Sequence, residues 1–427
     1  MLDIRLIRER TDFVKSELAK SGVDSAEIDA IVACDAERRR LQFELDEMRA
    51  RRTRESKELG RMAPDARETR RAEMRELGDR ITAAERTLSE IEQRCSALML
   101  GIRNIPRPYV PAGTGEADNQ IIRQEGEPAT LDFTPLPHWE LGEKLGIIDF
   151  ERGVKLSGTR FYVLAGLGAQ LQRALITFML DLKTREQAYL EVTPPLMVTS
   201  ETATSTGHLP KNADTMYHDV EDDFWFIPTA EVPLTSMYRG EILETEQLPI
   251  YLTAYTPCFR RERMSAGRDV RGIKRGHQFD KVEMVKLVRP ETSDDELQSL
   301  VENACEVCRR LEIPFRVIQV CTADLGFASA AQYDVEMWAP GLGEWLEVSS
   351  CSTCTDFQMR RANIRYRREK GGKTELVHSL NGSGLGLPRT LIAVLENYQQ
   401  ANGSVVIPKV LRPYMNGVET IRPGPRL

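Results

Sequence analysis

The sequence predicts an α+β protein that joins a long antiparallel helical arm to a domain built on a mostly antiparallel β-sheet flanked by helices. Two observations carry this prediction. Apolar residues repeat in heptads within residues 28–100, which is typical of a coiled coil. After about residue 138, short runs rich in β-branched and aromatic residues recur, and helical stretches separate only some of them. That pattern favours an antiparallel sheet over regular strand–helix alternation.

The heptad repeat defines the arm. In residues 74–98 the apolar positions lie alternately three and four residues apart without a break, at Met74, Leu77, Ile81, Ala84, Leu88, Ile91, Cys95 and Leu98. A weaker seam of Leu41, Leu45 and Met48 precedes a glycine and a proline at 60–65, which indicate a turn. We therefore predict an N-terminal domain, residues 1–105, with two long helices folded back on each other over about 28–100.

The expected tip of the arm is rich in arginine. From Arg49 to Arg71 there are nine basic and four acidic residues, a local net charge of +5 in a chain of formal net charge −7. A solvated helix face with ion pairs and a surface that binds nucleic-acid phosphates are evenly balanced interpretations of the residues alone. The basic residues are Arg49, Arg51, Arg52, Arg54, Lys57, Arg61, Arg67, Arg70 and Arg71.

The N-terminus and the cysteines bear on location. Charges interrupt MLDIRLIRERTDF every few residues, and no run approaches the roughly 18 apolar residues of a membrane span. We expect a cytoplasmic protein with no membrane partner, whose eight cysteines are mostly reduced thiols. Cys305 and Cys308 have the spacing of a zinc site, but they lie on the apolar stripe of a helical pattern, which favours the core over a metal.

Residues 106–135, which proline and glycine punctuate, are predicted to be a linker to a second domain, residues 136–427. Four polar clusters occur in this domain. Thr229 and Glu231 share a face if residues 228–233 are extended, although the flanking prolines could simply bound a loop. Residues 258–285 predict a hairpin carrying Arg260, Glu262 and Glu283, for which exposed cross-strand ion pairs are the alternative interpretation.

The other two clusters complete the pattern. Glu347 lies in an apolar strand beside serine hydroxyls, a set of oxygens that suits Mg²⁺; a lone glutamate on an edge strand is the alternative interpretation. The glycine-rich run 381–386 precedes a helix start; glycines allow close approach of a ligand, and helix starts favour anions. Each cluster alone is a weak signal. Together they suit a nucleoside triphosphate bound next to a small zwitterion.

These motifs resemble those of the seryl-tRNA synthetases, a family of class II aminoacyl-tRNA synthetases, over nearly the whole chain. FRRE…GRDVRG…HQFDKVEM is similar to motif 2, LNGSGLGLPRTLIAVLENYQQ…VLRPYM to motif 3, and TAEVPLT to the serine-binding loop. YLEVTPPLMV resembles motif 1, which in the family builds the dimer interface around a proline, here Pro194 or Pro195. The coiled-coil arm is also typical of the family.

The resemblance implies a ligase that activates L-serine with ATP as seryl-adenylate and transfers the seryl group to the 3′ end of tRNA(Ser). It implies that Glu283 accepts a hydrogen bond from the serine hydroxyl, and that Arg260 and Arg389 are catalytic, contacting the α- and γ-phosphates. The serine residues would be Thr229, Ala230, Glu231, Glu283, Asn381 and Ser383. The ATP residues would be Arg260, Arg261, Glu262, Arg275, Phe279, Glu347, Val348, Ser349, Ser350 and Arg389, with Glu347 and Ser350 as ligands of Mg²⁺.

The resemblance also implies a cytoplasmic homodimer whose arm grips tRNA(Ser), with tRNA(Sec) as a candidate second partner. Cys351 and Cys354 lie in SSCSTCTDFQ, which is similar to a family motif without zinc, so no zinc is expected. Two departures are visible. STGHLPK replaces the more usual GTGQLPK, and Arg263 and Met264 stand where many members carry a smaller segment.

Three alternatives explain the sequence less well. Relatives that load an amino acid onto a carrier protein lack the long arm, and a non-catalytic tRNA-binding paralogue would be expected to lose Arg260, Glu347 or Arg389. A coiled-coil scaffold leaves the charged clusters of the second domain unexplained.

Overall fold

A computed structural model describes the chain apart from residues 60–63, 129, 263–270 and 425–427, and describes only the backbone of residues 64–67. The chain divides into two units, Met1–Ile105 and Pro106–Leu427. The second unit includes the segment that the sequence predicts to be a linker, because residues 120–125 form a strand there. Among the described residues, none of the helices combines the length and the apolar character that a membrane crossing requires.

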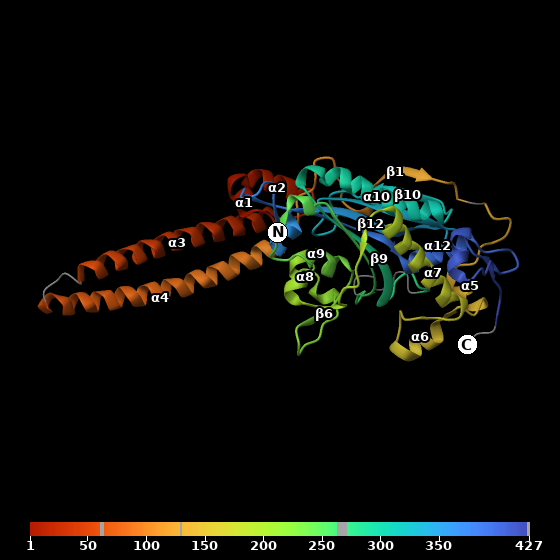
Figure 1. Cartoon of the computed structure of the whole chain (residues 1–427), viewed down its shortest axis with the longest axis horizontal. Helices are drawn as coiled ribbons and strands as arrows, with labels where there is room; N and C mark the ends of the chain where they lie inside the picture. Colours follow the sequence, from red (N-terminus) through yellow and green to blue (C-terminus); the bar gives the residue numbers. More distant parts are fainter. Residues whose placement is uncertain (60–63, 129, 263–270, 425–427) are drawn as a thin grey trace. The chain divides into compact units, whose positions relative to one another are not determined.

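The first unit is helical, and its two long helices form the predicted coiled coil. Its helices are α1 (Ile4–Glu9), α2 (Thr11–Ala19), α3 (Ser25–Leu59) and α4 (Pro64–Gly101). Helices α3 and α4 lie side by side and antiparallel (Figure 1). Both predicted seams meet in one apolar cluster that contains Leu41, Leu45, Met48, Met74, Leu77, Ile81, Ala84 and Leu88. The heptad prediction is confirmed, and of the predicted turn, residues 60–63 lie outside the described part of the chain.

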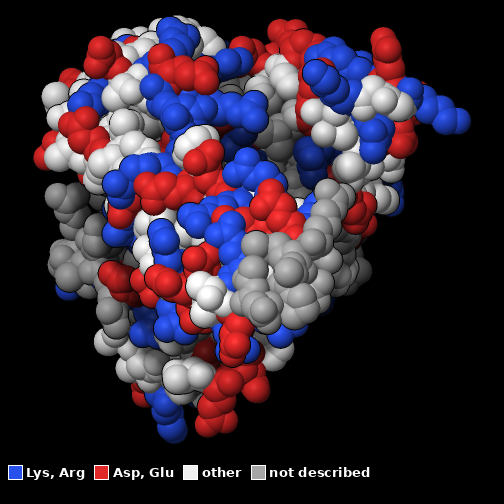
Figure 2. Space-filling view, turned by 90° about the vertical axis from the view of Figure 1, so that its left-hand side faces the viewer, with Lys and Arg blue, Asp and Glu red and all other residues white. Residues whose placement is uncertain are grey.

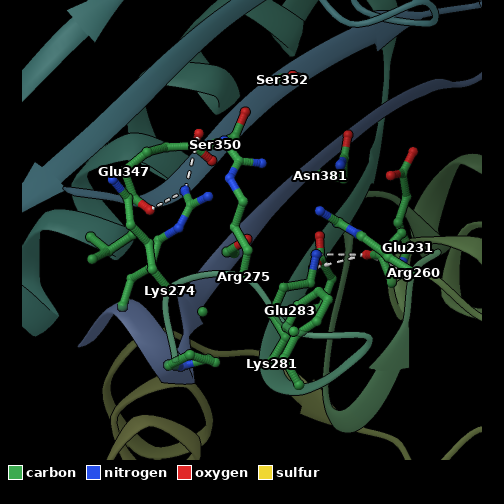
Figure 3. A pocket seen from close by; sticks show the side chains of 18 of the residues that line it. Glu231, Arg260, Lys274, Arg275, Lys281, Glu283, Glu347, Ser350, Ser352 and Asn381 are labelled. Atoms are coloured by element: carbon green, nitrogen blue, oxygen red, sulfur yellow. Dashed lines mark hydrogen bonds and ion pairs between the residues drawn. The ribbon is translucent and has the colours of Figure 1, made fainter. Parts of the chain in front are cut away.

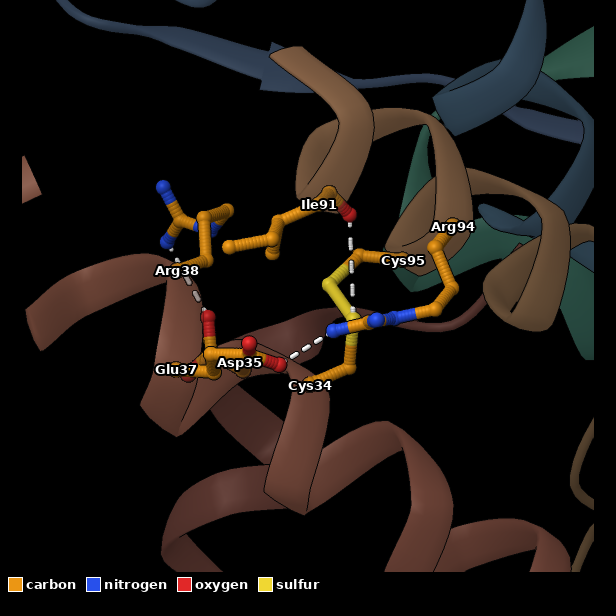
Figure 4. Close-up of a disulfide and its surroundings, with 7 residues drawn as sticks. All are labelled: Cys34, Asp35, Glu37, Arg38, Ile91, Arg94 and Cys95. Carbon is orange, nitrogen blue, oxygen red and sulfur yellow. Dashed lines mark hydrogen bonds and ion pairs between the residues drawn. A yellow bond between two sulfur atoms is a disulfide. The ribbon is translucent and has the colours of Figure 1, made fainter. Parts of the chain in front are cut away.

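A disulfide joins the two helices of the arm. Cys34 of α3 and Cys95 of α4 are bonded, with their Cα atoms 5.7 Å apart, and they lie 61 positions apart in the sequence (Figure 4). Arg94, the residue before Cys95, forms an ion pair with Glu37 of α3. The other six cysteines are free and buried, so most of the eight are thiols, as expected.

The second unit is built on an eight-stranded sheet with the strand order β1-β10-β11-β12-β15-β9-β8-β4. All neighbouring pairs are antiparallel except β4–β8. The strands are β1 (Gln120–Glu125), β4 (Leu190–Glu191), β8 (Ile250–Phe259), β9 (Gln278–Val288), β10 (Phe315–Gln319), β11 (Ala331–Ala339), β12 (Glu344–Thr355) and β15 (His378–Gly386). The predicted mixed fold with a mostly antiparallel sheet is therefore confirmed.

Three long helices pack against this sheet: α7 (Leu167–Asp181), α10 (Ser293–Arg310) and α12 (Leu387–Asn397). They correspond to helical stretches that the sequence predicts at 168–189, 291–311 and 388–400, and they share one core with the central strands. The shorter helices are α5 (His138–Lys144), α6 (Phe150–Ser157), α8 (Ser200–Thr206), α9 (Glu231–Ser236) and α11 (Phe357–Ala362). The remaining strands are β2 (Ile148–Asp149), β3 (Val163–Leu164), β5 (Met197–Thr199), β6 (Phe224–Phe226), β7 (Ile242–Glu244), β13 (Arg365–Arg367), β14 (Thr374–Leu376), β16 (Val405–Val406) and β17 (Thr420–Ile421).

Strand alternation separates the core from the site. Cys351 of β12 and Gly382 of β15 are paired in register, and both pack against Leu300 of α10. Because successive side chains of a strand point to opposite faces, Ser350, Ser352, Asn381 and Ser383 project to the other face. There they line a cavity.

Candidate active site

The cavity has a volume of about 400 Å³ and collects polar side chains from distant parts of the chain. They come from β9, β11, β12 and β15, from the starts of α9 and α12, and from the connecting segments next to α8, α9, β8 and β9; Figure 3 labels several of them. The predicted residues that line it are Thr229, Glu231, Arg260, Glu262, Arg275, Phe279, Glu283, Glu347, Val348, Ser350, Asn381, Ser383 and Arg389. The structure thus brings together residues that lie as much as 160 positions apart in the sequence.

One end of the cavity holds two buried carboxylates. Glu231 is 9% exposed and Glu283 is 1% exposed. Thr229 lies between them, because its hydroxyl donates to Glu283 Oε2 at 3.2 Å and accepts from the Glu231 N–H at 3.2 Å. Residues 228–233 are not an extended segment: Glu231 begins α9, and Thr229 lies just before that helix. The two predicted residues still point into one site.

The environment of these carboxylates opposes their ionisation. Burial raises the pKa of Glu283, and the neighbouring Lys281 counteracts this shift, while Glu231 adds to it. Burial likewise raises the pKa of Glu231, against the hydrogen bond from Gln358 and the charges of Lys281 and Arg260. A cationic or hydrogen-bond-donating ligand would favour the ionised form of both groups.

Gln358 of α11 fixes Glu231. Its side-chain amide donates to Glu231 Oε1 at 2.6 Å and to the Thr206 carbonyl at 3.0 Å. Its carbonyl accepts from the Ser379 hydroxyl at 2.7 Å, which orients the amide. Gln358 and Ser379 are both buried, so this chain of hydrogen bonds sets the position of the carboxylate from behind.

Arginines also line the cavity, and Arg260 lies beside the carboxylates. The Arg260 guanidinium lies 5.0 Å from the centre of the Phe279 ring, and its Nε donates to the Pro228 carbonyl at 3.2 Å. Arg275 lies 3.7 Å from the Glu262 carboxylate. Glu262 has a φ of 47°, a left-handed conformation that is unusual for a non-glycine residue and recurs at functional sites. Such a row of guanidinium groups suits a polyphosphate.

Arg389, at the start of α12, approaches β12. Its Nη1 donates to the Glu347 carbonyl at 2.7 Å and lies 3.3 Å from the Glu347 carboxylate. Ser350 lines the cavity three residues further along the same strand. Carboxylate and hydroxyl oxygens are the kind of ligand that Mg²⁺ accepts. Within the described part of the chain, no group of three or more His, Cys, Asp or Glu side chains is arranged to hold a metal ion.

Three predicted residues do not line the cavity. Arg261 donates from Nε to the Met216 carbonyl at 2.8 Å and lies 4.9 Å from the Tyr217 ring, so its guanidinium points away from the site. Ser349 is buried and donates to the Ser383 carbonyl at 2.6 Å. Ala230 is fully buried in the core. Arg263 and Met264 lie outside the described residues.

Two glycines of the 381–386 run have a packing role that the sequence analysis did not foresee. A Cβ atom at Gly382 would meet Cys351 Sγ at 2.8 Å, and one at Gly384 would meet Lys183 Cε at 2.9 Å. Both contacts lie away from the cavity. The predicted close approach to a ligand fits Gly386 better, because Gly386 lines the cavity.

The cavity also contains residues that the sequence analysis did not assign. His208 belongs to the STGHLPK departure, and burial lowers its pKa to about 4, so it is neutral at physiological pH. Lys274 donates to Glu344 at 2.8 Å. Lys281 shares a strand face with Glu283, and this alternation was the only sequence signal for its place in the site. Ser329, Gln332 and Ser352 gave no signal.

The cysteine pairs with zinc-like spacing are packed in the interior. Cys305 and Cys308 lie on the buried face of α10, and Cys351 and Cys354 lie on β12. Burial raises the pKa of Cys305 to about 11 and that of Cys351 to about 12, which keeps both as thiols near neutral pH.

The described arginines of the arm tip are exposed except for Arg70, which is half-buried, and some are paired. Arg49 lies 2.7 Å from Glu85, Arg51 lies 2.7 Å from Glu55, and Arg70 contacts both Glu55 and Glu73. Arg52, Arg54 and Arg71 form no ion pair with the described residues. The side of the molecule that Figure 2 shows carries basic and acidic side chains interspersed rather than one continuous basic field. Arg61 and the side chain of Arg67 lie outside the described part of the chain.

Comparison with known proteins places these features in a family. Residues 1–106 match the model of the seryl-tRNA synthetase N-terminal domain, and residues 215–398 match that of the tRNA synthetase class II core domain (G, H, P, S and T). The serine–tRNA ligase of Roseiflexus sp. (strain RS-1) is 61% identical over 99% of this chain and 100% of its own length. That of Chloroflexus aurantiacus (strain ATCC 29366 / DSM 635 / J-10-fl) is 57% identical over 99% of this chain and 100% of its own length.

A solved structure agrees. The crystal structure of seryl-tRNA synthetase from Pyrococcus horikoshii complexed with ATP superposes with a TM-score of 0.93, at 38% identity, over the full length of both chains. With the fold, the paired carboxylates and the row of arginines already in place, these likenesses lead to one conclusion: the chain belongs to the seryl-tRNA synthetase family of class II aminoacyl-tRNA synthetases.

Proposed function

We propose that the cavity is the active site of an ATP-dependent serine–tRNA ligase, with serine at the Glu231–Glu283 end and ATP along Arg260, Arg275 and Arg389. The observation that carries this proposal is the unpaired state of one carboxylate oxygen, Glu283 Oε1. This buried atom has no hydrogen-bond partner among the described residues. Burying an acceptor without a hydrogen-bond donor destabilises the protein, and a hydroxyl of a bound substrate would supply the missing hydrogen bond.

The proposed chemistry needs charge neutralisation more than proton transfer. The serine carboxylate attacks the ATP α-phosphorus, seryl-adenylate forms, and pyrophosphate leaves. Both reactants are anionic, so the enzyme must align them and offset their repulsion. Arg260 would hold the carboxylate against the α-phosphate, Arg389 the γ-phosphate, and Phe279 the adenine. The seryl group then passes to the 3′-terminal ribose of the tRNA.

Mg²⁺ fits the residues at the phosphate end. Glu347 and Ser350 offer oxygen ligands from one strand, and both line the cavity. Mg²⁺ is usually held by one or two protein oxygens together with substrate phosphates and water, so two ligands suffice. When bound, the ion would neutralise phosphate charge.

We assign tRNA recognition to residues 1–105, a linking role to 106–135 and catalysis to 136–427. The exposed arginines of the tip would bind the phosphate backbone of tRNA(Ser), with tRNA(Sec) as a second candidate substrate. We propose a cytoplasmic homodimer that forms through residues 189–198. Two large apolar side chains near that segment's ends support an interface, since Leu190 is 62% exposed and Met197 is 49% exposed.

The test is aminoacylation of purified tRNA(Ser) and tRNA(Sec) with each amino acid, together with ATP–pyrophosphate exchange. We expect serine alone to be charged. Alanine should support exchange less well than serine by a factor of about 10⁴, because it leaves Glu283 Oε1 unpaired. Efficient charging with another amino acid would contradict the ligase assignment, whereas equal exchange with alanine and serine would contradict only the role of Glu283.

A further inference from the structure

Lys281 contacts Glu283 and Thr229 at the serine end of the cavity, and the family resemblance assigns it no role. Its side chain is 9% exposed. Its ammonium forms an ion pair with Glu283 Oε2 and donates to the Thr229 hydroxyl at 2.7 Å. Figure 3 shows Lys281 and Glu283 projecting into the same cavity. Two residues apart on β9, they point to the same face of the sheet.

We propose that Lys281 is a positioning residue for serine selection: its ammonium holds Glu283 Oε2 and the Thr229 hydroxyl, so that Glu283 Oε1 alone faces the substrate hydroxyl. This inference rests on the proposed function, since it gives Lys281 a task only if Glu283 receives the hydroxyl of serine.

The hydrogen-bond inventory supports this division of the carboxylate. The Thr229 hydroxyl can donate once and accept twice. It accepts from Lys281 and from the Glu231 N–H, and it donates to Glu283 Oε2, so its capacity is filled. Glu283 Oε2 therefore has two partners and Oε1 has none among the described residues. In the proposed function the Glu283 carboxylate distinguishes the hydroxyl of serine from the methyl group of alanine, and its free oxygen is the atom that would accept that hydroxyl.

A second lysine of β9 forms an ion pair with a glutamate of α10, and this pair shows what a purely structural arrangement looks like. Lys286 is fully buried, lies 2.8 Å from Glu296 Oε2 and also donates to Ser299. Glu296 Oε1 accepts from the Tyr251 hydroxyl at 2.6 Å. Both oxygens of Glu296 are thus satisfied within the protein. The Lys281–Glu283 pair differs because one carboxylate oxygen, Glu283 Oε1, has no partner among the described residues.

The charge of Lys281 also bears on the ionisation of Glu283. The titratable groups around Glu283 are Lys281 on its own strand, Glu231 of α9, Arg260 after β8, His208 after α8, and Cys258 of β8, whose pKa burial raises. Burial raises the pKa of Glu283, Glu231 raises it further, and Lys281 lowers it. His208 contributes little charge, because burial holds its pKa at about 4. Without Lys281, Glu283 would retain its proton to higher pH and would accept the serine hydroxyl poorly.

The experiment measures ATP–pyrophosphate exchange by the full-length protein from about pH 6 to about pH 8, a range in which free serine keeps its charges. Lys281→Met removes the charge at similar volume, Lys281→Arg retains it, and Glu283→Gln removes the partner. Lys286→Met is the matched control for loss of a buried lysine from β9. Thermal unfolding establishes that each variant is folded.

We expect Lys281→Met to raise the KM for serine roughly 10- to 100-fold at neutral pH, with the KM for ATP within about twofold. Its serine KM should fall as pH rises, because Glu283 then loses its proton, while the wild type changes little. Lys281→Arg should recover part of the affinity. Lys286→Met should lower the unfolding temperature and leave the serine KM within about twofold.

Other outcomes overturn the proposal. An unchanged serine KM in Lys281→Met, an increase that is equal at every pH, or an equal increase in the ATP KM would each do so. If Lys281→Met does not fold, the double variant Lys281→Met/Glu283→Gln leaves no unpaired buried charge. The serine KM of the double variant should exceed that of Glu283→Gln alone by less than about twofold. A larger difference between the two variants overturns the proposal. If Glu283→Gln itself leaves serine binding intact, the proposed role of Glu283 fails instead.

Discussion

Arg389 and Glu347 are partners before any substrate is considered: the guanidinium lies 3.3 Å from the carboxylate and donates to the carbonyl of the same residue at 2.7 Å. We have proposed Arg389 for the γ-phosphate and Glu347 for Mg²⁺. Binding of MgATP would exchange this ion pair for an arginine–phosphate and a carboxylate–Mg²⁺ contact. The pair holds both groups in place and prevents the free carboxylate from repelling the incoming phosphates.

Arg389→Ala should therefore affect two properties of exchange. We expect the rate constant to fall roughly 10²- to 10³-fold, as for the loss of one donor to a charged transition state, while the KM for serine stays within about twofold. The Mg²⁺ concentration needed for half-maximal rate should also change, because Glu347 loses its cation. Steady-state exchange at varied Mg²⁺ measures both, with Arg261→Ala as the control for an arginine that points away from the cavity. A full rate for Arg389→Ala would refute its assignment.

Ser379→Ala should weaken serine binding without touching the cavity. It removes the 2.7 Å hydrogen bond that orients the Gln358 amide, which in turn holds Glu231. One net hydrogen bond is worth about 1 kcal/mol, so we expect the serine KM to rise about fivefold and the ATP KM to remain unchanged. ATP–pyrophosphate exchange kinetics measure both KM values. The serine KM of Ser379→Cys, which retains a weak donor, should lie between those of the wild type and Ser379→Ala. Equal changes in both KM values would show a general loss of structure.

Replacing residues 36–94 by a short glycine–serine link should separate the two steps. The catalytic unit keeps its own core, so adenylate formation should persist within about threefold. Charging of tRNA should fall to background, because the arm and its arginines are gone. Full charging by the shortened chain would contradict the role of the arm.

A finer test uses the unpaired arginines. Arg52→Ala/Arg54→Ala should weaken tRNA binding and reduce its salt dependence by about one unit of slope for each phosphate that is no longer bound. The matched control, Arg80→Ala/Arg86→Ala, removes two exposed arginines from α4 away from the tip. Equal effects of both pairs on tRNA affinity would mean that net charge, rather than the tip, drives binding. Exchange rates should be unchanged in either pair.

The disulfide predicts how many thiols react before and after reduction. Unfolded, unreduced protein should show six reactive thiols and fully reduced protein eight, because only Cys34 and Cys95 are bonded. In the native state alkylation should be slow near neutral pH, since all six free cysteines are buried and burial raises the pKa of Cys351 to about 12. Alkylation followed by mass determination gives these numbers. Eight thiols before reduction would show that Cys34 and Cys95 are not joined.

Cys34→Ser should destabilise the arm alone. The loop that the disulfide closes has 61 positions, for which the chain-entropy model gives at most about 4 kcal/mol of unfolding free energy. We expect an earlier unfolding transition of the helical unit by circular dichroism and an unchanged rate of exchange. Reducing agent should move the wild type to the same transition and leave Cys34→Ser unaffected. A parallel loss of exchange would link the disulfide to the catalytic unit.

Local patterns explain what the sequence could predict. The heptad seam depends on residues three and four apart, and the β8–β9 hairpin on neighbouring strands, so both were visible in the chain. Gln358 was missed because its partner Glu231 is 127 positions away. The Cys34–Cys95 bond was missed for the same reason, although Cys95 was placed in the seam. Arg261 was assigned to ATP by motif alone, and only the fold shows that the Met216 carbonyl holds its side chain elsewhere.

The heptad seam has a consequence for how the arm can vary among relatives. The residues of the seam pack against the facing helix, so the apolar cluster of the arm repeats every seven residues along its length. Adding seven residues to α3 and seven to α4 at facing positions would keep the apolar residues of the two helices in register and extend the arm by about 10 Å. Unequal insertions would rotate one seam away from the other. Among relatives, the length of the arm should therefore differ by multiples of seven residues in both helices at once. The catalytic unit need not change when the arm length changes.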